Sequence, residues 1–198
     1  AHRRTSMAGG RVEQNGIRCC YHGWLWDARG KCLETPPEEP ESKLKDMVSM
    51  RAYPVQEAAG LVFVYIGPSP APLLPKFDLL VQATGTRYVW GFTDHCNWLQ
   101  CAEVTADVTH LNWLHAGVYP MYAGKRPKVE YHERDYGIEY LYNMAGLPAD
   151  KCSSVIFPSG NRFASARVEL KGASRQNMVF RTPEDDVTTH NFFISRSE

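Results

Sequence analysis

The sequence lacks a long apolar run and any excess of one charge. Its longest apolar run covers residues 60–67, far short of the roughly 20 apolar residues of a transmembrane helix. Glycines bound that run, which has the length of a buried strand. Lysine and arginine together number 22, as do aspartate and glutamate, so the charge balance gives no reason to expect a nucleic acid or an anionic membrane as partner. We expect no membrane span.

Dense, regular cysteine spacing is also missing. The six cysteines in 198 residues do not form the pattern of a small secreted disulfide scaffold. They fit a reducing compartment, and we expect a cytoplasmic protein. The chain has no initiating methionine and opens inside a motif, so we expect an internal segment of a longer protein, for which a signal peptide cannot be judged.

A proline-rich stretch divides the chain. Residues 67–75 contain four prolines, which block helix and interior strand and favour an extended connector. We therefore expect two domains, 1–70 and 71–198. The first reads as a small all-β unit, with hairpins turning at residues 15–16 and 29–30.

The second domain reads as α+β, with an antiparallel sheet of the helix-grip type. A stretch without glycine or proline predicts a helix over residues 96–115. Apolar and β-branched segments predict strands, and these lie at residues 87–92, 136–142, 154–157, 163–170 and 187–195.

Metal-ligand spacing appears near the start of the chain. His2 is followed, after sixteen residues, by Cys19 and then His22. Cys-x-His followed by Cys-x-x-His builds a Rieske [2Fe–2S] site, in which two histidines replace two cysteines on one iron. The first cysteine would precede Ala1. The alternatives are that Cys19 and His22 are ordinary core residues or half of a zinc site.

A second histidine pattern lies in the expected helix. Asp107, His110 and His115 follow the spacing Asp-x-x-His-x-x-x-x-His. Residues five apart on a straight helix point about 140° apart, so one metal could bind both histidines only across a bulge, helix end or bend. Asp107 could hydrogen-bond a histidine ring from one turn away. Two histidines on a helix can equally be structural residues.

The two motifs, together with Tyr-His-Gly-Trp at residues 21–24, resemble those of the α subunit of the Rieske non-haem iron aromatic ring-hydroxylating oxygenases. The resemblance is greatest to the phthalate dioxygenase-like group. The resemblance implies that His2, Cys19 and His22 hold the cluster. It implies that His110 and His115 bind mononuclear Fe(II) with a carboxylate from beyond Glu198, as in the 2-His-1-carboxylate triad. Asp107 would bridge the cluster of one subunit to the iron of the next.

The resemblance also places Asn97 near the iron, so that Asp107 and Asn97 are the candidate catalytic residues. It implies an EC 1.14-type oxidoreductase that takes electrons from NAD(P)H through a reductase of flavin or ferredoxin type. It further implies a homo-oligomer, such as a trimer, acting on an aromatic substrate and O2. For a carboxylated substrate, the arginines available to pair with it are Arg162, Arg167 and Arg181.

Three alternatives stay open. An O-demethylating monooxygenase would use the same metals. A Rieske electron carrier would need no second iron motif, and a zinc module would need only Cys19 and His22. Because one ligand of each metal is absent from the sequence, we expect these 198 residues alone to be inactive.

Overall fold

The computed structural model describes residues 2–120, 123–124, 126–144, 151–163 and 175–197. The chain forms two compact units, residues 1–74 and 75–198, so the division falls inside the proline-rich stretch. Within the described residues, no helix is long and apolar enough to cross a membrane.

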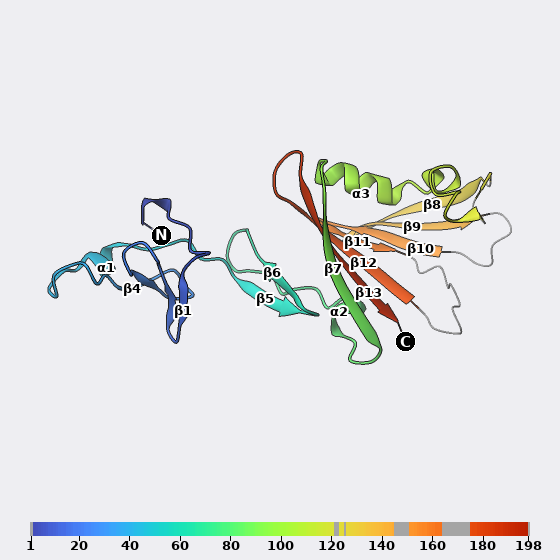
Figure 1. Cartoon of the computed structure of the whole chain (residues 1–198). Helices are drawn as coiled ribbons and strands as arrows, with labels where there is room; N and C mark the ends of the chain where they lie inside the picture. Colours follow the sequence, from blue (N-terminus) through green and yellow to red (C-terminus); the bar gives the residue numbers. More distant parts are fainter. Residues whose placement is uncertain (1, 121–122, 125, 145–150, 164–174, 198) are drawn as a thin grey trace. The chain divides into compact units, whose positions relative to one another are not determined.

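The first unit is built from short antiparallel hairpins (Figure 1). A four-stranded sheet has the order β1-β2-β3-β4, and a separate hairpin pairs β5 with β6. Trp24, Trp26 and Cys32 form its buried core. The elements are η1 (His2–Arg4), β1 (Arg11–Glu13), β2 (Gly16–Arg18), β3 (Leu25–Trp26), β4 (Cys32–Glu34), α1 (Leu44–Met47), β5 (Val55–Ala58) and β6 (Leu61–Val64).

Both expected hairpins of this unit are present. β1 and β2 pair across the turn at residues 14–15, and β3 pairs with β4 across the turn that contains Gly30. Gly30 has φ 82°, and its carbonyl accepts a 2.7 Å hydrogen bond from the Met50 N–H. This turn therefore joins the second hairpin to the segment that follows α1.

Replacing Gly30 with alanine is expected to destabilise the first unit. A Cβ at this position would lie 1.8 Å from the Met50 carbonyl oxygen, so backbone must shift in addition to the strain of a positive φ. We expect a loss of about 2 kcal/mol or more in the free energy of unfolding, measured by denaturant titration.

Gly60 supplies the matched control. Its φ is 81°, and a Cβ there meets nothing within 4 Å. Gly60→Ala therefore carries the backbone strain without the clash, about 1 kcal/mol. Equal losses for the two variants would show that the contact with Met50 does not matter.

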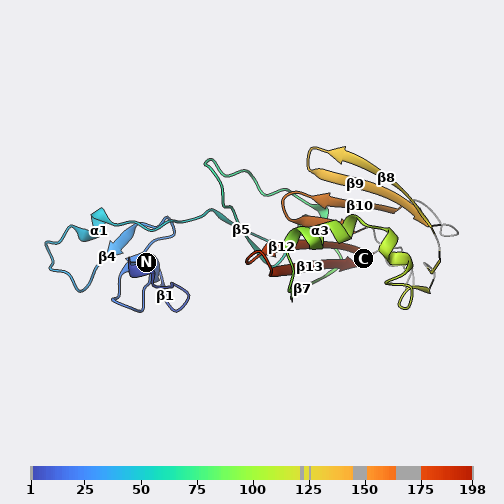
Figure 2. The same cartoon turned by 90° about the horizontal axis from the view of Figure 1, so that it is seen from above.

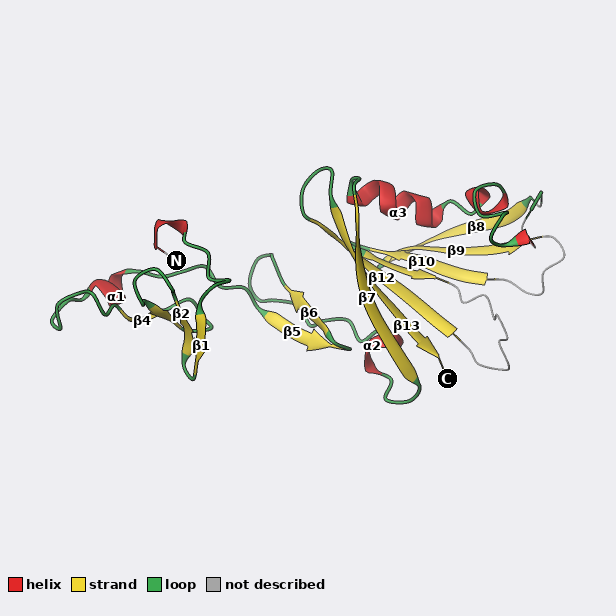
Figure 3. Cartoon of the chain, in the orientation of Figure 1, coloured by secondary structure: helices red, strands yellow, loops and turns green. Residues whose placement is uncertain are grey.

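The second unit is a seven-stranded antiparallel sheet with α3 on one side of it (Figures 1 and 2). The strand order is β7-β13-β12-β11-β10-β9-β8, and α3 packs against β10 and β12. Figure 3 shows how few helices accompany the sheet, and the α+β class is confirmed. The elements are α2 (Asp78–Val81), β7 (Thr86–Asp94), α3 (Trp98–Ala106), η2 (Thr109–Asn112), β8 (Pro127–Arg134), β9 (Gly137–Met144), β10 (Lys151–Ile156), β11 (Gly160–Phe163), β12 (Arg175–Pro183) and β13 (Thr189–Ser197).

The sheet matches the expected strands in part. β7, β9, β10 and β13 lie close to predicted segments, whereas β8 and β12 were not predicted. The strand expected at residues 163–170 falls mostly outside the described residues. The single helix expected over residues 96–115 is wrong, because α3 ends at Ala106 and Asp107 has the extended backbone angles φ −83°, ψ 101°.

A buried polar group ties α3 to the sheet. The Arg181 guanidinium on β12 donates to Asn161 Oδ1, Asn191 Oδ1 and Thr105 Oγ1, each at 2.8 Å. Asn191 in turn donates to Asp94 Oδ2 at 3.0 Å. Three strands, β11, β12 and β13, are thus joined to α3 through one side chain that is 8% exposed. Burial lowers the pKa of this arginine.

Candidate metal sites

The loop after β2 carries two of the predicted ligands. Cys19 is only 2% exposed, whereas His22 is exposed and its ring lies 3.8 Å, centroid to centroid, from that of Tyr21. The Cys19 N–H donates to the Trp24 carbonyl at 2.8 Å, and the Gly23 N–H donates to the Cys19 carbonyl at 3.0 Å. These two hydrogen bonds close the loop from Cys19 to Trp24, which carries both predicted metal ligands.

The loop sits on a packed base. Trp24 directly follows it, and its ring lies 6.0 Å from that of Trp26 in the core of the unit. A buried thiol and an imidazole three residues apart, held on a closed turn, fit the mixed sulfur and nitrogen ligation of a Rieske cluster. The third predicted ligand, His2, belongs to η1, but its side chain lies outside the described residues.

The second candidate site begins where α3 ends. Asp107 Oδ1 accepts a 2.8 Å hydrogen bond from the Thr109 N–H, which turns the chain out of α3 and into η2. η2 ends at Asn112, between the two histidines. The expected helix end between His110 and His115 is therefore present.

This change of direction brings the two histidines together. The ring centroids of His110 and His115 are 5.1 Å apart, with the ring planes at 65°. His110 Nδ1 lies 3.8 Å from Asp107 Oδ2, and this nitrogen is buried without a hydrogen-bond partner. A metal-bound histidine commonly donates its other ring N–H to a carboxylate, so an orphaned nitrogen beside Asp107 fits an iron-binding role for His110.

Two tyrosines that the sequence did not single out hold the end of α3. Tyr140 donates its hydroxyl to the Thr105 carbonyl at 2.5 Å, and Tyr131 donates to the Ala106 carbonyl at 2.9 Å. They are directly paired across β8 and β9. Burial raises the pKa of both hydroxyls, and the charge of Asp107 raises that of Tyr131 further. Both therefore remain protonated donors at neutral pH.

Asn97 is not brought to the histidine pair. It is the N-cap of α3, where its Oδ1 accepts from the Leu99 N–H at 2.9 Å and its Nδ2 donates to the Asp186 carbonyl at 3.1 Å. Nine helical residues, about 13 Å of axial rise, separate it from Asp107. These contacts are those of a helix cap, and a catalytic role for Asn97 has no support from its position.

The arginines available to a carboxylated substrate lie in different settings. Arg162 is exposed and pairs with Asp78 at 3.0 Å, while Arg167 lies outside the described residues. Arg181 is buried in the polar group under α3. It is therefore not a surface arginine.

Each candidate site has two described donors. Across the described segments, no three His, Cys, Asp or Glu side chains converge as a complete metal-binding set. Cys19 with His22, and His110 with His115, are thus partial sets that need further ligands to complete a cluster or an iron site.

Comparison with known proteins places the chain among Rieske proteins. Residues 1–56 match the family described as the Rieske [2Fe-2S] domain. The oxygenase subunit of 5,5'-dehydrodivanillate O-demethylase from a Sphingobium species is 42% identical over 94% of this chain and 45% of its own length. The phthalate 4,5-dioxygenase oxygenase subunit of Pseudomonas putida is 30% identical over 70% of this chain and 36% of its length. The chain spans about half the length, or less, of such relatives.

Solved structures share the fold. NdmA of Pseudomonas putida CBB5 superposes with a TM-score of 0.77 at 19% identity, covering 96% of this chain and 56% of that one. Dicamba monooxygenase superposes with a TM-score of 0.73 at 19% identity, covering 95% and 61%. The similarity extends over both units of the chain.

Proposed function

Because the chain belongs to the family of Rieske oxygenase subunits, in its phthalate dioxygenase-like group, we propose that it forms part of the terminal oxygenase of a two-component or three-component system. Electrons pass from NAD(P)H through a reductase, and oxygen from O2 enters an aromatic, carboxylated substrate. The observation that carries the proposal is the presence, in one chain, of a closed Cys19–His22 loop and a paired His110 and His115.

The family's cofactors are a Rieske [2Fe–2S] cluster and mononuclear iron, which supply electron storage and O2 activation. In this proposal His2, Cys19 and His22 hold the cluster, and His110 and His115 hold the iron. The described residues contribute by positioning the ligands. The Asp107 carboxylate lies 3.8 Å from His110 Nδ1, where it would orient the ring of a metal-bound histidine, and the hydroxyls of Tyr131 and Tyr140 fix the helix end next to Asp107.

The proposal includes a homo-oligomer in which Asp107 lies between the iron of one subunit and the cluster of its neighbour. It rests on the family resemblance and on the exposure of Asp107, whose side chain is 51% accessible and therefore open to a partner. We also propose a cytoplasmic location, because all six cysteines are free thiols.

O-demethylation is a second candidate. The relative with 42% identity over 94% of this chain is an O-demethylase subunit, whereas the phthalate dioxygenase subunit is 30% identical over a smaller part. In that case the oxidised position is a methoxy carbon, and the product is a phenol with release of formaldehyde.

One experiment tests the class and separates the two reactions. The protein produced from its complete coding sequence is supplied with a reductase, NADH, ¹⁸O2 and a panel of benzoates, phthalates and methoxybenzoates. We expect substrate-dependent NADH oxidation with label in the product. Labelled diol product identifies a dioxygenase, and formaldehyde identifies a demethylase. A protein without a reducible cluster and with bound zinc would reject the proposal.

A further inference from the structure

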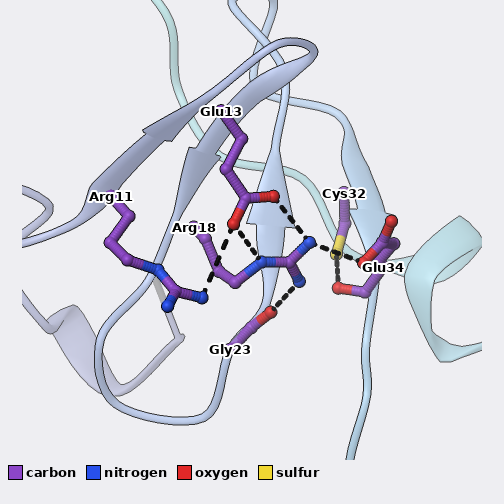
Figure 4. A network of polar contacts seen from close by, with 6 residues as sticks. All are labelled: Arg11, Glu13, Arg18, Gly23, Cys32 and Glu34. Carbon is purple, nitrogen blue, oxygen red and sulfur yellow. Dashed lines mark hydrogen bonds and ion pairs between the residues drawn. The ribbon is translucent and has the colours of Figure 1, made fainter.

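Arg18 lies directly before Cys19 and makes a branched set of contacts (Figure 4). Its Nε and Nη2 donate to the two carboxylate oxygens of Glu13 at 2.7 and 2.8 Å. Nη2 also donates to Glu34 Oε2 at 2.8 Å, and Nη1 donates to the Gly23 carbonyl at 2.7 Å. The side chain is only 16% exposed, so these contacts are partly shielded from water.

The Gly23 contact reaches the loop that carries both described ligands. Gly23 directly follows His22 and adopts φ 74°, a backbone conformation that favours glycine. Its N–H already closes the loop onto the Cys19 carbonyl. Arg18 donates to the Gly23 carbonyl, so both backbone polar groups of Gly23 are hydrogen-bonded. The loop is therefore held by a side chain as well as by the backbone.

The two glutamates hold the guanidinium in place from separate strands. Glu13 belongs to β1, Glu34 to β4 and Arg18 to β2, and β1 and β4 are the two edges of the sheet. A planar guanidinium can donate two hydrogen bonds to one carboxylate, as Arg18 does to Glu13, while another N–H donates to a third group, here the Gly23 carbonyl. A lysine ammonium lacks that fork.

We propose that Arg18 is a positioning residue for the cluster, anchoring the Cys19–His22 loop to both edges of the sheet so that its thiol and imidazole are held ready for iron. The inference rests on the proposed function, since it concerns the same cluster. It predicts that cluster retention depends on the shape of the residue at position 18 and not only on its positive charge.

The test compares Arg18→Lys with Arg11→Lys in the protein produced from its complete coding sequence. Arg11 lies on the neighbouring strand, is 77% exposed and reaches Glu13 only at 3.6 Å, so its replacement controls for local charge. The readouts are iron and sulfide per chain, the rate of iron loss to a chelator, and the EPR spectrum of the reduced cluster.

We expect Arg18→Lys to lose iron about 10-fold faster, in the range for residues that orient metal ligands, with a broadened EPR signal. Arg11→Lys should match the wild type. Should Arg18→Lys fail to fold by far-UV circular dichroism, Glu13→Gln decides, because it weakens the bidentate pair and leaves Arg18 present. Faster iron loss in Glu13→Gln supports the proposal.

If Arg18→Lys loses iron at the wild-type rate and gives the wild-type EPR spectrum, the positioning role is wrong. Where Arg18→Lys does not fold, the same result in Glu13→Gln shows this. A wild-type protein that shows no Rieske-type EPR signal overturns the proposed function itself. The two failures are therefore distinguished by the wild-type sample alone.

Discussion

Asp107→Asn is expected to lower the rate of substrate oxidation about 100-fold while leaving the [2Fe–2S] cluster intact. Asp107 Oδ1 accepts from the Thr109 N–H, and Oδ2 lies near His110 Nδ1. Asparagine keeps an oxygen for the first contact but puts an amide NH2 in place of the second oxygen. The carboxylate oxygen 3.8 Å from His110 Nδ1 is then replaced by a donor, so this nitrogen, which has no hydrogen-bond partner in the structure, has no nearby acceptor that could orient the ring when the metal binds.

The comparison with Asp107→Ala separates orientation from capping. Alanine removes both contacts, so it should lose oxidation and lower the thermal stability of the helix end. Glu103→Gln, an exposed carboxylate one turn earlier on α3, should retain activity. The measurements are product formation with reductase and NADH, EPR of the reduced cluster, and iron per chain. Normal turnover by Asp107→Asn would show that its carboxylate has no role beyond the cap.

The candidate ligands could be proposed from the sequence because their spacing is local. Cys19 with His22, and His110 with His115, stand at the spacing of metal ligands, and the roughly 140° between positions five apart required a bulge, a helix end or a bend between the two histidines. The exact place of the break was not predictable. Asp107 competes for backbone N–H groups as short polar residues do, and α3 ends at Ala106, well before the end at residue 115 that the uninterrupted pattern suggested.

The missed parts differ in kind. β8, at an edge of the sheet, alternates Val129 and Tyr131 with Lys128, Glu130 and His132, so its local pattern could have indicated a strand. The role of Tyr131 depends on its pairing with Tyr140 and on the approach of α3. No short sequence window contains that information.

The Asn97 assignment rests on resemblance, and the contacts of this residue give it a structural role as well. Asparagine is also a favoured helix N-cap, and the structure assigns that role with a 2.9 Å bond to the Leu99 N–H. Sequence alone could have raised this alternative, since residues 98–106 follow it as an uninterrupted helical segment.

Arg181→Met is expected to lower the free energy of unfolding of the second unit by about 3 kcal/mol. Methionine fills similar length but donates nothing, so the oxygens of Asn161, Asn191 and Thr105 lose their 2.8 Å donors inside the protein. An unpaired buried acceptor costs about 1–3 kcal/mol, and relief from burying the guanidinium offsets part of the sum. Denaturant titration followed by far-UV circular dichroism measures the loss.

Arg162→Met is the matched control, because Arg162 forms an exposed ion pair with Asp78, their side chains 44% and 40% accessible. Such pairs contribute about 0–1 kcal/mol. Arg181→Lys should fall between the two, since an ammonium keeps the charge but not the three-way geometry. If Arg181→Met costs no more than Arg162→Met, the polar group does not anchor α3. The position of Asp107 would then depend on Tyr131 and Tyr140 alone, and Tyr140→Phe would become the variant that shifts the helix end.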